Sequence, residues 1–569
     1  RPHKPLAVMF ADLEQVRAHC RVDAVEAELL ASPEHPIVLL EWRELGPHGE
    51  PLAEVGAAIL PAERAVPAEV AVGQRYLGAM LPYTPLHVLL LAAAGRPLVM
   101  TSGNLAEEPI VTSWQEAGRL AAIPDAYLVH DREIAVRYDD SVAQVRGGRP
   151  RLIRRSRGYA PFPISLPRPL PQTFAAGAEL KNTFCLTRDA NAFLSQHIGD
   201  LENLETLEHY EASVDVYRRL FRIEPEVVAY DLHPEYLATK HALALPPPEK
   251  VAVQHHHAHI AARLVEHGRE EPVIGVSMDG LGYGDDGRLW GGEVLVCDLT
   301  GYRRVARFEE LPLAGGAAAI THPWRTALGW SYALLEHDGL ERAAALLRRG
   351  EIGRGPPGAG AAGRAAVGVH PSDEQAAALT QQIDRGVNAP LTTSCGRLFD
   401  AVAALAGVRH SISYEGQAAI ELEMMTSGPG LRAAGAPSYE WSLDGDPGAA
   451  AVAPMMGAAE WVAARSAAAD PGPVPAVVRL APLLAGVLDD LEAGDAPGAV
   501  GARLHATVAG FVLDLCRRVR SATGLSAVAM SGGVFQNRLL ADLCEGLLVG
   551  DGFEVLGAGL VPVNDGGVS

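Results

Sequence analysis

The strongest chemical signal in the chain is a histidine cluster, Gln254-His255-His256-His257-Ala258-His259, which follows a predicted strand and begins a helical pattern. Residues four apart on a helix share one face, so His255 and His259 can bind one metal ion. His256 and His259, three apart, form a second possible pair. Because imidazole is the commonest transition-metal ligand, we favour metal or phosphate chemistry over a cluster of solvated or hydrogen-bonded histidines.

Two histidines do not complete a metal site, and two aspartates elsewhere in the chain are candidates for the remaining ligands. Asp279 ends the apolar stretch 273–278, and Asp565 lies in the motif Asn-Asp-Gly-Gly near the last residue. Considered alone, each aspartate is more commonly a turn or helix-cap residue than a metal ligand. Taken with the histidines, they form a mixed set that suits iron, zinc or manganese better than calcium. The predicted metal ligands are His255, His259, Asp279 and Asp565.

Two glycine-rich stretches follow predicted strands and are candidate phosphate-binding loops. Ser531, Gly532 and Gly533 precede a helical pattern that begins near Asn537, so bare backbone N–H groups would lie at a helix start. We favour nucleotide binding there over a tight structural turn. The stretch 280–287 could cradle a phosphate or form a plain hairpin loop, and its spacing fits neither an EF-hand nor a Walker loop.

Weaker signals come from other polar side chains beside glycine. Asp400 and Gly416 could hold a ribose, although an ordinary helix start explains the pattern equally well. Near the beginning of the chain, a Thr-Ser-Gly-Asn run follows a strand and could bind phosphate or form only a turn. Its polar members are Thr101, Ser102 and Asn104. Further donors in the same region are Arg137, Ser141, Arg154, Arg155 and Arg157.

Several common enzyme signatures are absent from the sequence. There is no Gly-x-Ser-x-Gly elbow, no His-Glu-x-x-His helix and no kinase motif, which argues against a serine hydrolase, a zincin and a protein kinase. None of the six cysteines forms a Cys-x-x-Cys pair, so we expect a reducing compartment and a cytoplasmic location. The longest apolar stretch, near residues 87–95, is too short to cross a bilayer.

Composition indicates a globular protein of several domains, with 569 residues of which 48 % are apolar. The formal net charge of −21 repels a polyphosphate backbone and argues against broad nucleic-acid binding. Only four of the 48 basic residues are lysines. Codon bias is the simplest explanation, but a lysine in so arginine-rich a chain could mark a position where the two are not interchangeable. The four are Lys4, Lys181, Lys240 and Lys250.

The pattern of strands, helices and prolines divides the chain into two parts. Three alternating prolines predict an extended linker over residues 166–172, between a domain of residues 1–165 and one of residues 173–569. Upstream, strands are predicted at 36–40 and 96–100, with helical turns over 69–95. Downstream, strands at 182–186, 227–231, 251–253 and 272–278 alternate with helices, of which 204–221 is one. This alternation is typical of an α/β fold with mixed sheets. The stretches 353–369 and 428–453 are predicted to be loops or insertions.

Taken together, these motifs resemble a known family. Residues 1–9, Thr101–Asn104, Asp139–Val142 and Arg154–Tyr159 are similar to a YrdC/Sua5-like domain. The His-His-His-Ala-His string, residues 278–293, Ser531–Val534 and Asn564–Gly567 resemble a Kae1/TsaD-like domain of the two-lobed actin-like superfamily. In this order, the two units look like the HypF carbamoyltransferase family of [NiFe]-hydrogenase maturation. The resemblance implies a YrdC-like twisted-sheet domain followed by an actin-like, two-lobed domain.

The resemblance also implies a reaction. Family members use carbamoyl phosphate and ATP, form carbamoyl-adenylate, and transfer the carbamoyl group to the C-terminal cysteine of the partner HypE. The implied cofactors are ATP, Mg and a divalent transition metal, zinc or iron, in the second domain. Lys4, Thr101, Ser102, Asn104, Ser141 and Arg155 would serve adenylate formation; Asp400, Gly416, Ser531, Gly532, Gly533 and Asn537 would bind nucleotide; and Lys4, Arg155, His255 and His259 would be catalytic.

Three points qualify this expectation. The family carries an acylphosphatase domain and zinc-finger-like modules upstream, so we expect this chain, which begins at Arg1, to be an N-terminally truncated part of a longer protein that lacks the first YrdC-like strand. The alternative enzyme is an O-carbamoyltransferase that acts on a small-molecule hydroxyl. The alternative that is not an enzyme is an actin-like scaffold that binds nucleotide without catalysis. No nucleic-acid or membrane partner is expected, and oligomerisation is left open.

Overall fold

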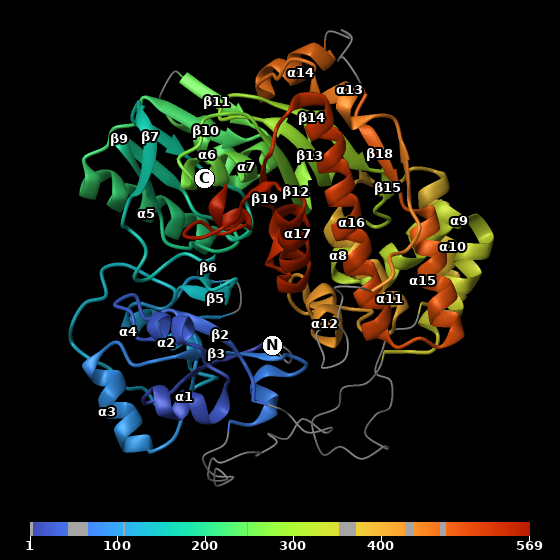
Figure 1. The fold of residues 1–569 in the computed structure, drawn as a ribbon. Coiled ribbons are helices and arrows are strands. Elements are labelled where there is room, and N and C mark those ends of the chain that lie inside the picture. The colour runs from blue at the N-terminus through green and yellow to red at the C-terminus, as the bar shows by residue number, and fades with distance from the viewer. Residues whose placement is uncertain are drawn as a thin grey trace.

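The structure, a computed structural model, describes residues 4–43, 66–105, 108–246, 249–351, 371–426, 436–466 and 474–569. Three sheets organise these residues (Figure 1). The first belongs to the N-terminal part, and the second and third belong to the remainder of the chain. All three mix parallel and antiparallel pairs, so the predicted α/β class is confirmed.

The first sheet has six strands in the order β4-β1-β3-β2-β5-β6. Its strands are β1 (Ala7–Met9), β2 (Ile37–Glu41), β3 (Tyr76–Met80), β4 (Leu98–Met100), β5 (Val142–Arg146) and β6 (Arg149–Arg154). Its helices are α1 (Leu13–His19), α2 (Ala24–Leu30), α3 (Pro85–Ala94) and α4 (Trp114–Ala117), with single turns η2 (Ala68–Ala71) and η3 (Gly118–Leu120). The predicted run of helical turns over 69–95 is therefore wrong in its middle, where β3 pairs with both β1 and β2.

The second sheet has five strands in the order β11-β10-β8-β9-β7. They are β7 (Ile164–Leu170), β8 (Thr173–Ala175), β9 (Cys185–Leu194), β10 (Val227–Asp231) and β11 (Glu249–Val253). Helices α5 (Leu204–Phe221), α6 (Leu237–Ala244) and α7 (His255–Glu266) accompany them. The linker predicted over 166–172 is instead largely strand, because β7 lies at the sheet edge, where prolines that lack an N–H are tolerated.

The third sheet has the order β17-β18-β14-β13-β12-β19-β20, with β15 and β16 beside β13. Its strands are β12 (Val273–Tyr283), β13 (Leu289–Cys297), β14 (Tyr302–Phe308), β15 (Leu311–Pro312), β16 (Leu391–Thr392), β17 (Ser442–Asp444), β18 (Ala476–Arg479), β19 (Ala527–Ser531) and β20 (Glu554–Leu556). Its helices are α8 (Ala317–Thr321), α9 (Pro323–Leu347), α10 (Asp373–Asp384), α11 (Cys395–Leu405), α12 (Gln417–Thr426), α13 (Pro447–Ala451), α14 (Ala458–Ser466), α15 (Ala481–Ala493), α16 (Pro497–Thr523) and α17 (Arg538–Gly550), with turns η5 (Gly533–Gln536) and η6 (Asp565–Gly567).

The predicted loops in this part have mixed outcomes. The stretch 353–369 lies outside the described residues, as do residues 428–435 of the second stretch. The described remainder of that second stretch contains β17 and α13, so it is not simply a loop. Of the two alternatives for 280–287, the structure supports the hairpin: residues 280–283 belong to β12, and Tyr283 pairs with Leu289 of β13 across the turn.

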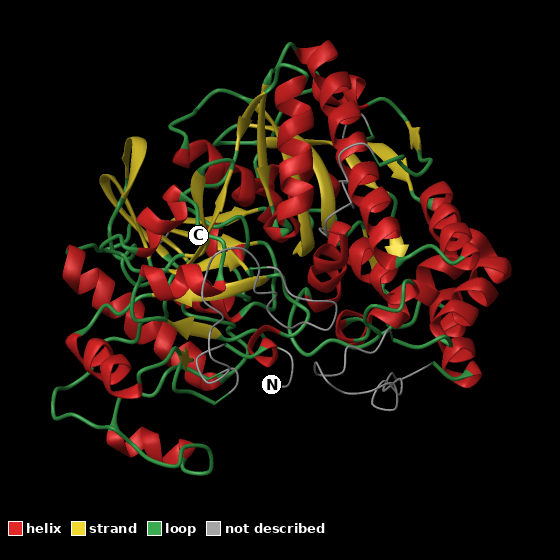
Figure 2. Cartoon of the chain, turned by 60° about the horizontal axis from the view of Figure 1, so that its bottom comes forward, coloured by secondary structure: helices red, strands yellow, loops and turns green. Residues whose placement is uncertain are grey.

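The two faces of the third sheet are covered differently, and strand alternation decides which side chain meets which layer. Ile274, Val276 and Met278 of β12 belong to the large core formed with α9, α11, α15 and α16, which Figure 2 shows gathered on one side of the sheet. The opposite face packs against Ile260 and Leu264 of α7. Odd-numbered residues of β12 therefore face α7.

One helix, α16, is long and apolar enough to cross a membrane by length and hydropathy alone. However, 67 % of its most apolar window is buried inside the protein, against α12, α13 and α17. Its composition is therefore explained by its place in the core.

The N-terminal part is joined to the rest by polar contacts along β5 and β6. The Leu152 N–H donates to the Gly559 carbonyl at 2.9 Å, and the Arg146 guanidinium contacts Asp542 at 2.9 Å. A second contact region lies at α12, where the Arg75 N–H donates to Met424 Sδ at 3.4 Å. Next to it, the Glu423 carboxylate accepts a hydrogen bond from the Leu539 N–H at 3.1 Å, at the first turn of α17.

Replacing Glu423 should change how stability depends on pH. Burial raises the pKa of this carboxyl to about 7, against the partial opposition of backbone hydrogen bonds. The folded protein then binds the proton more tightly than the unfolded chain, so stability falls as pH rises from about 4.5 to about 7. Glu423→Gln keeps the neutral form and should recover about 1–3 kcal/mol at pH 8 relative to pH 5, measured by urea unfolding. The exposed Glu14→Gln is the control and should leave the pH dependence of the unfolding free energy unchanged. If wild type and Glu423→Gln show the same pH dependence, the prediction is wrong.

Candidate functional site

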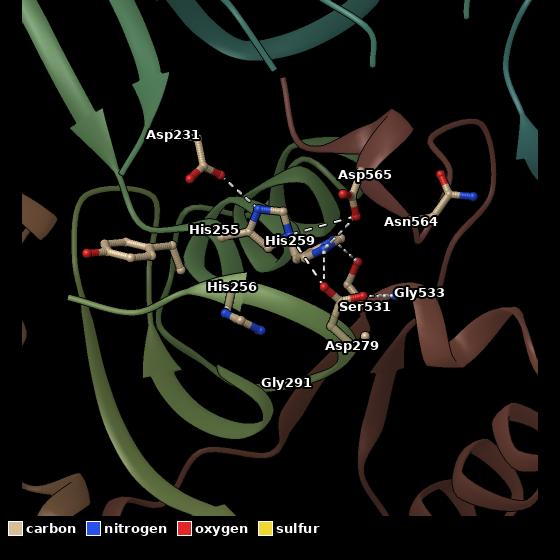
Figure 3. Close-up of polar contacts among 12 residues, drawn as sticks. Asp231, His255, His256, His259, Asp279, Gly291, Ser531, Gly533, Asn564 and Asp565 are labelled. Carbon is tan, nitrogen blue, oxygen red and sulfur yellow. Dashed lines mark hydrogen bonds and ion pairs between the residues drawn. The ribbon is translucent and has the colours of Figure 1, made fainter. Parts of the chain in front are cut away.

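Helix α7 presents two imidazoles toward the third sheet (Figure 3). The helix starts directly after β11, where the Gln254 side chain caps it by accepting a hydrogen bond from the His257 N–H at 2.9 Å. His255 and His259 lie one helical turn apart on the buried side, with ring centroids 4.8 Å apart, and both are 1 % exposed. The predicted pairing of residues four apart is thus the one that the helix builds.

Two carboxylates face these imidazoles. Asp279 follows the alternation of β12 onto the face that α7 covers, and Asp565 comes from η6, close to the end of the chain. The Nε2 atom of His255 lies 3.4 Å from Asp279 Oδ2 and 3.7 Å from Asp565 Oδ1. The Nε2 atom of His259 lies 3.8 Å and 3.9 Å from the same two oxygens. One ligand atom from each residue lies within 4.8 Å of all the others.

This cluster fits a divalent transition metal. Bonds of about 2.0–2.2 Å to a common ion place neighbouring ligand atoms roughly 3–3.5 Å apart, slightly closer than they are here. The Nε2 atoms of both histidines are buried and have no hydrogen-bond partner, which is costly unless something else binds them. Mixed imidazole and carboxylate donors suit zinc, iron or manganese. The assignment of these residues as metal ligands stays a prediction.

Neighbouring groups hold each ligand in place. The Nδ1–H of His255 donates to Asp231 Oδ2 at 2.8 Å, and Nδ1 of His259 lies 3.4 Å from Ser531 Oγ. The Gly533 N–H donates to Asp279 Oδ1 at 2.7 Å, which leaves Oδ2 of Asp279 directed at the histidines. Such contacts fix the orientation of a metal ligand before the ion arrives.

The charges in the cluster depend on one another. Burial by itself raises the pKa of Asp279, but the close imidazoles of His255 and His259 outweigh it and hold that pKa well below its usual range. Burial also lowers the pKa of His255, and there the nearby carboxylates, Asp231 first, raise it well above normal. Burial raises the pKa of Asp565 to about 7, with the charge of His255 opposing. A bound cation would relieve the repulsion between the two carboxylates.

Helix α7 also positions the loop that carries Asp565. Two turns after the histidines, Glu266 Oε1 accepts a hydrogen bond from the Val561 N–H at 3.2 Å, and the buried Arg263 donates to the Pro562 carbonyl at 3.2 Å. From the other side, the Asn564 amide donates to the Ile153 carbonyl of β6 at 3.0 Å. The loop is therefore fixed between α7 and the N-terminal part.

The glycine-rich stretches serve the cluster through close packing. A side chain at Gly282 would place Cβ 2.5 Å from the His256 ring and 2.6 Å from the His255 ring. Gly532 has φ +102°, and a Cβ there would lie 2.2 Å from the Met278 carbonyl oxygen. Neither position can hold a larger residue without a shift. The Gly533 N–H, predicted to cradle a phosphate, is instead occupied by Asp279.

The other residues predicted to bind nucleotide in this part have defined structural partners. Asp400 is buried and pairs with Arg397 at 2.8 Å. Asn537 caps α17 by accepting from the Leu540 N–H at 2.9 Å, and its amide lies 2.8 Å from the His505 ring. Gly416 precedes α12. Ser531 is the member of this predicted set whose side chain reaches the metal cluster, at His259.

In the N-terminal part, the predicted adenylate-forming residues divide into two groups. Thr101 and Ser102 are exposed, and Asn104, partly buried in the same turn, bonds to the carbonyls of that turn. Ser141 is fully buried and bonds to the backbone of Ser156 and Arg157. Lys4 is exposed. Burial raises the pKa of Asp139, and the charges of Arg154 and, to a smaller extent, Lys4 oppose it.

The structure does not favour the predicted catalytic role of Arg155. Its guanidinium is 4 % exposed and donates to three backbone carbonyls, of Leu194 at 3.1 Å, Tyr159 at 2.9 Å and Phe162 at 2.7 Å. These bonds hold the backbone of the 159–162 turn and of Leu194, and the catalytic role of Arg155 stays a prediction. The second possible pairing, His256 with His259, is not realised either, since the His256 ring lies against Trp290 with centroids 5.8 Å apart.

Two residues near the cluster had little sequence signal. Asp231 ends β10 and orients His255, but an aspartate after a strand is too common to single out. Lys181 lies close enough to Asp565 to influence its pKa, and it pairs with Glu415. The scarcity of lysine in the chain was the sequence feature that could have pointed to it.

Comparisons with known proteins agree on one family. A family model described as "Carbamoyltransferase, Kae1-like Domain, second subdomain" matches residues 275–569, and one described as "HypF Kae1-like domain" matches residues 168–266. A Sua5/YciO/YrdC model, described as "Telomere recombination", matches residues 52–156. The predicted order of a YrdC-like and a Kae1-like domain is thereby confirmed.

Relatives match along the whole chain. Carbamoyltransferase HypF2 of Cupriavidus necator is 40 % identical, and HypF of Rhizobium leguminosarum bv. viciae is 35 % identical; the alignments cover 100 % of this chain and 67 % and 65 % of those proteins. The chain thus spans about two thirds of the length of these relatives. A crystal structure of full-length HypF "in the phosphate- and nucleotide-bound form" matches with TM-score 0.83 and 37 % identity, over 100 % of this chain and 78 % of that one. HypF of T. kodakarensis matches with TM-score 0.80 and 28 % identity, over 100 % and 66 %.

Removing either cluster histidine should abolish tight metal binding. His255→Ala and His259→Ala each delete one ligand, so we expect loss of at least tenfold in zinc or iron affinity, measured by competition with a chromogenic chelator. His257→Gln is a matched control from the same motif, because the Nε2–H of His257 donates to the Asp298 carbonyl at 2.7 Å, away from the cluster. Equal loss in all three variants would mean that folding, not ligation, had been measured.

Asp231→Asn should weaken metal binding without deleting a ligand. The substitution keeps the shape but loses the charged acceptor that orients His255, and outer partners of this kind are worth about 10–100-fold in metal affinity. The same chelator competition measures it, with the melting temperature of the metal-free protein as control. An unchanged metal affinity would show that Asp231 does not act through His255.

Proposed function

The chain belongs to the HypF family of carbamoyltransferases, and from that premise we propose that it uses carbamoyl phosphate and ATP, through carbamoyl-adenylate, to carbamoylate the C-terminal cysteine of a HypE partner. The observation that carries the proposal is the buried cluster of His255, His259, Asp279 and Asp565, built from three separate parts of the chain. A simple nucleotide-binding scaffold has no need of such a cluster.

Adenylate formation is assigned to the N-terminal domain. Water hydrolyses carbamoyl phosphate to carbamate and inorganic phosphate. A carbamate oxygen then attacks the α-phosphorus of ATP, the bond from that phosphorus to the bridging oxygen breaks, and pyrophosphate leaves with Mg, so that carbamoyl-adenylate forms. The exposed Thr101–Asn104 turn and Lys4 supply hydroxyl, N–H and cationic groups for this step. Ser141 and Arg155 act through the fold, since they hold the 156–162 segment in place.

Carbamoyl transfer is assigned to the second domain. The partner's thiolate attacks the carbamoyl carbon, a C–S bond forms, the bond to the phosphate oxygen breaks, and AMP leaves with the electron pair. A metal held by the four cluster residues would supply Lewis-acid stabilisation of charge on a carbonyl or phosphate oxygen. Asp231 and Ser531 orient the imidazoles, and the Gly533 N–H orients Asp279, so that the site is preorganised.

The nucleophile is assigned to the partner because this chain offers none. All six cysteines are buried and unpaired, and burial raises the pKa of the Cys297, Cys395 and Cys516 thiols far above the physiological range. Six unpaired cysteines also fit a reducing compartment, and we infer a cytoplasmic location. The carbamoyl-adenylate hydrolyses readily, which favours direct transfer between the two domains that meet along β6.

The acceptor can be identified by label transfer. The full-length protein is incubated with ATP, labelled carbamoyl phosphate and either a peptide ending in cysteine or an aminoglycoside-type hydroxyl acceptor. Label on the cysteine is the expected result. Label on the hydroxyl would identify an O-carbamoyltransferase, and label on neither, with nucleotide still bound, would identify a scaffold; both would overturn the proposal.

His259→Ala should separate the two half-reactions. Loss of a metal-cluster ligand should reduce transfer to cysteine by at least 100-fold, while carbamoyl-phosphate-dependent exchange of pyrophosphate into ATP stays within twofold of wild type, because adenylate forms in the other domain. His257→Gln again serves as control. Parallel loss of exchange and transfer would contradict the division into two sites.

A further inference from the structure

Lys181 is held in a constrained turn between β8 and β9. Its φ of +47° lies in the left-handed region, which a residue with a long side chain adopts only when its surroundings enforce it. Two contacts enforce it here: the Lys181 N–H donates to Asp200 Oδ1 at 2.7 Å, and the Asn182 amide donates to the Ala176 carbonyl at 3.1 Å. Backbone strain of this kind is characteristic of functional positions.

The turn lies against the loop that carries a predicted metal ligand. The Thr183 hydroxyl donates to the Gly566 carbonyl at 3.2 Å, next to Asp565. The ammonium of Lys181 pairs with Glu415, which lies 234 positions later, in the turn before α12. The pair therefore joins a turn of the second sheet to the helical layer of the third, beside the metal cluster.

The ion pair by itself does not account for this construction. The side chains of Lys181 and Glu415 are 27 % and 51 % exposed, and a partly solvated ion pair adds little to stability. A strained backbone is more costly than the pair is stabilising. The arrangement is better explained by a ligand that Lys181 meets when Glu415 releases it.

The charges around the pair indicate what that ligand is. Asp565, Asp279 and Glu415 are all acidic, and Asp400, a residue on the predicted nucleotide pattern, is close enough to feel the charge of Glu415. Glu415 also immediately precedes Gly416, another residue of that pattern. A phosphate entering so acidic a region needs a cation, and the pairing with the Glu415 carboxylate shows that the Lys181 ammonium can hold an anionic oxygen.

Lysine suits an exchange of partners better than arginine does. Its ammonium is a compact charge on a flexible stem, whereas the guanidinium is a planar fork that fits one fixed geometry. This chain uses arginine at 44 of 48 basic positions, and Lys181 is one of the four exceptions.

We propose that Lys181 binds the phosphate of carbamoyl-adenylate beside the metal cluster and stabilises the departing AMP, and that Glu415 holds the ammonium while the nucleotide is absent. The proposal rests on the proposed function. In the transfer step, the C–S bond forms as the bond between the carbamoyl carbon and the phosphate oxygen breaks. The electron pair goes to that oxygen, where Lys181 meets it without giving up a proton.

Opposite effects of the two partners test the proposal. Lys181→Met should lower kcat/KM for transfer to cysteine at least 100-fold. It should also weaken AMP binding at the site in the second domain at least tenfold, measured by calorimetry on the metal-loaded protein. Glu415→Gln removes the competing carboxylate, so it should retain transfer and raise the AMP affinity of the same site about threefold. Lys181→Arg should recover AMP binding better than transfer, because a fixed fork adapts poorly to the transition state.

The controls separate this role from a structural one. Lys240→Met is the matched control. Lys240 lies on α6, beside the second sheet, and also forms an exposed ion pair, with Glu235 at 2.7 Å. Metal affinity should be unchanged in every variant. Equal losses of transfer and of melting temperature in Lys181→Met and Glu415→Gln would overturn the proposal. If wild type carbamoylates no cysteine, the proposed function fails, while unequal AMP binding by the two variants still supports Lys181 as a phosphate ligand.

Discussion

The cost of burying two imidazoles whose Nε2 atoms have no hydrogen-bond partner, opposite two carboxylates, constrains the second half of the molecule. The Nε2 atoms of His255 and His259 and the facing carboxylate oxygens lie 3.4–3.9 Å apart, too far for strong hydrogen bonds. Burial of such groups is unfavourable unless an ion joins them. The surrounding structure must therefore hold them together, and its rigidity is visible in the bonds from Asp231, Ser531 and the Gly533 N–H.

Helix α7 is the element through which this constraint acts. It starts from the second sheet, packs its apolar side on the third, supplies both imidazoles, and then fixes the Asp565 loop through Arg263 and Glu266. A shift of this helix would move both imidazoles and the Asp565 loop relative to Asp279 on β12. Because β6 holds the same loop through Asn564, the N-terminal domain is mechanically connected to the site where we place transfer.

The division of chemistry between two domains follows from the same geometry. A reactive anhydride made in one domain must reach the second without meeting water, and polar contacts along β5 and β6 keep the domains adjacent. Lys181 and Glu415 lie where the two halves of the second domain face each other, so an ion pair there can respond to a ligand that enters between them.

Local patterns in the sequence determined a good deal of this protein. The helix at 204–221 and the strand at 227–231 have the predicted bounds, because their periodicity and flanking residues are unambiguous. The i, i+4 spacing of His255 and His259 fixed their common face, and the glycine-rich runs marked places of close packing. Tertiary structure decided what no spacing encodes. It made 164–170 an edge strand despite its prolines, used Arg155 to brace a turn, and brought Asp279, Asp565, Asp231 and Lys181 to one place. These depend on which strands pair and which face of β12 meets α7, and such long-range contacts are set by the packing of the whole core rather than by neighbours in the chain.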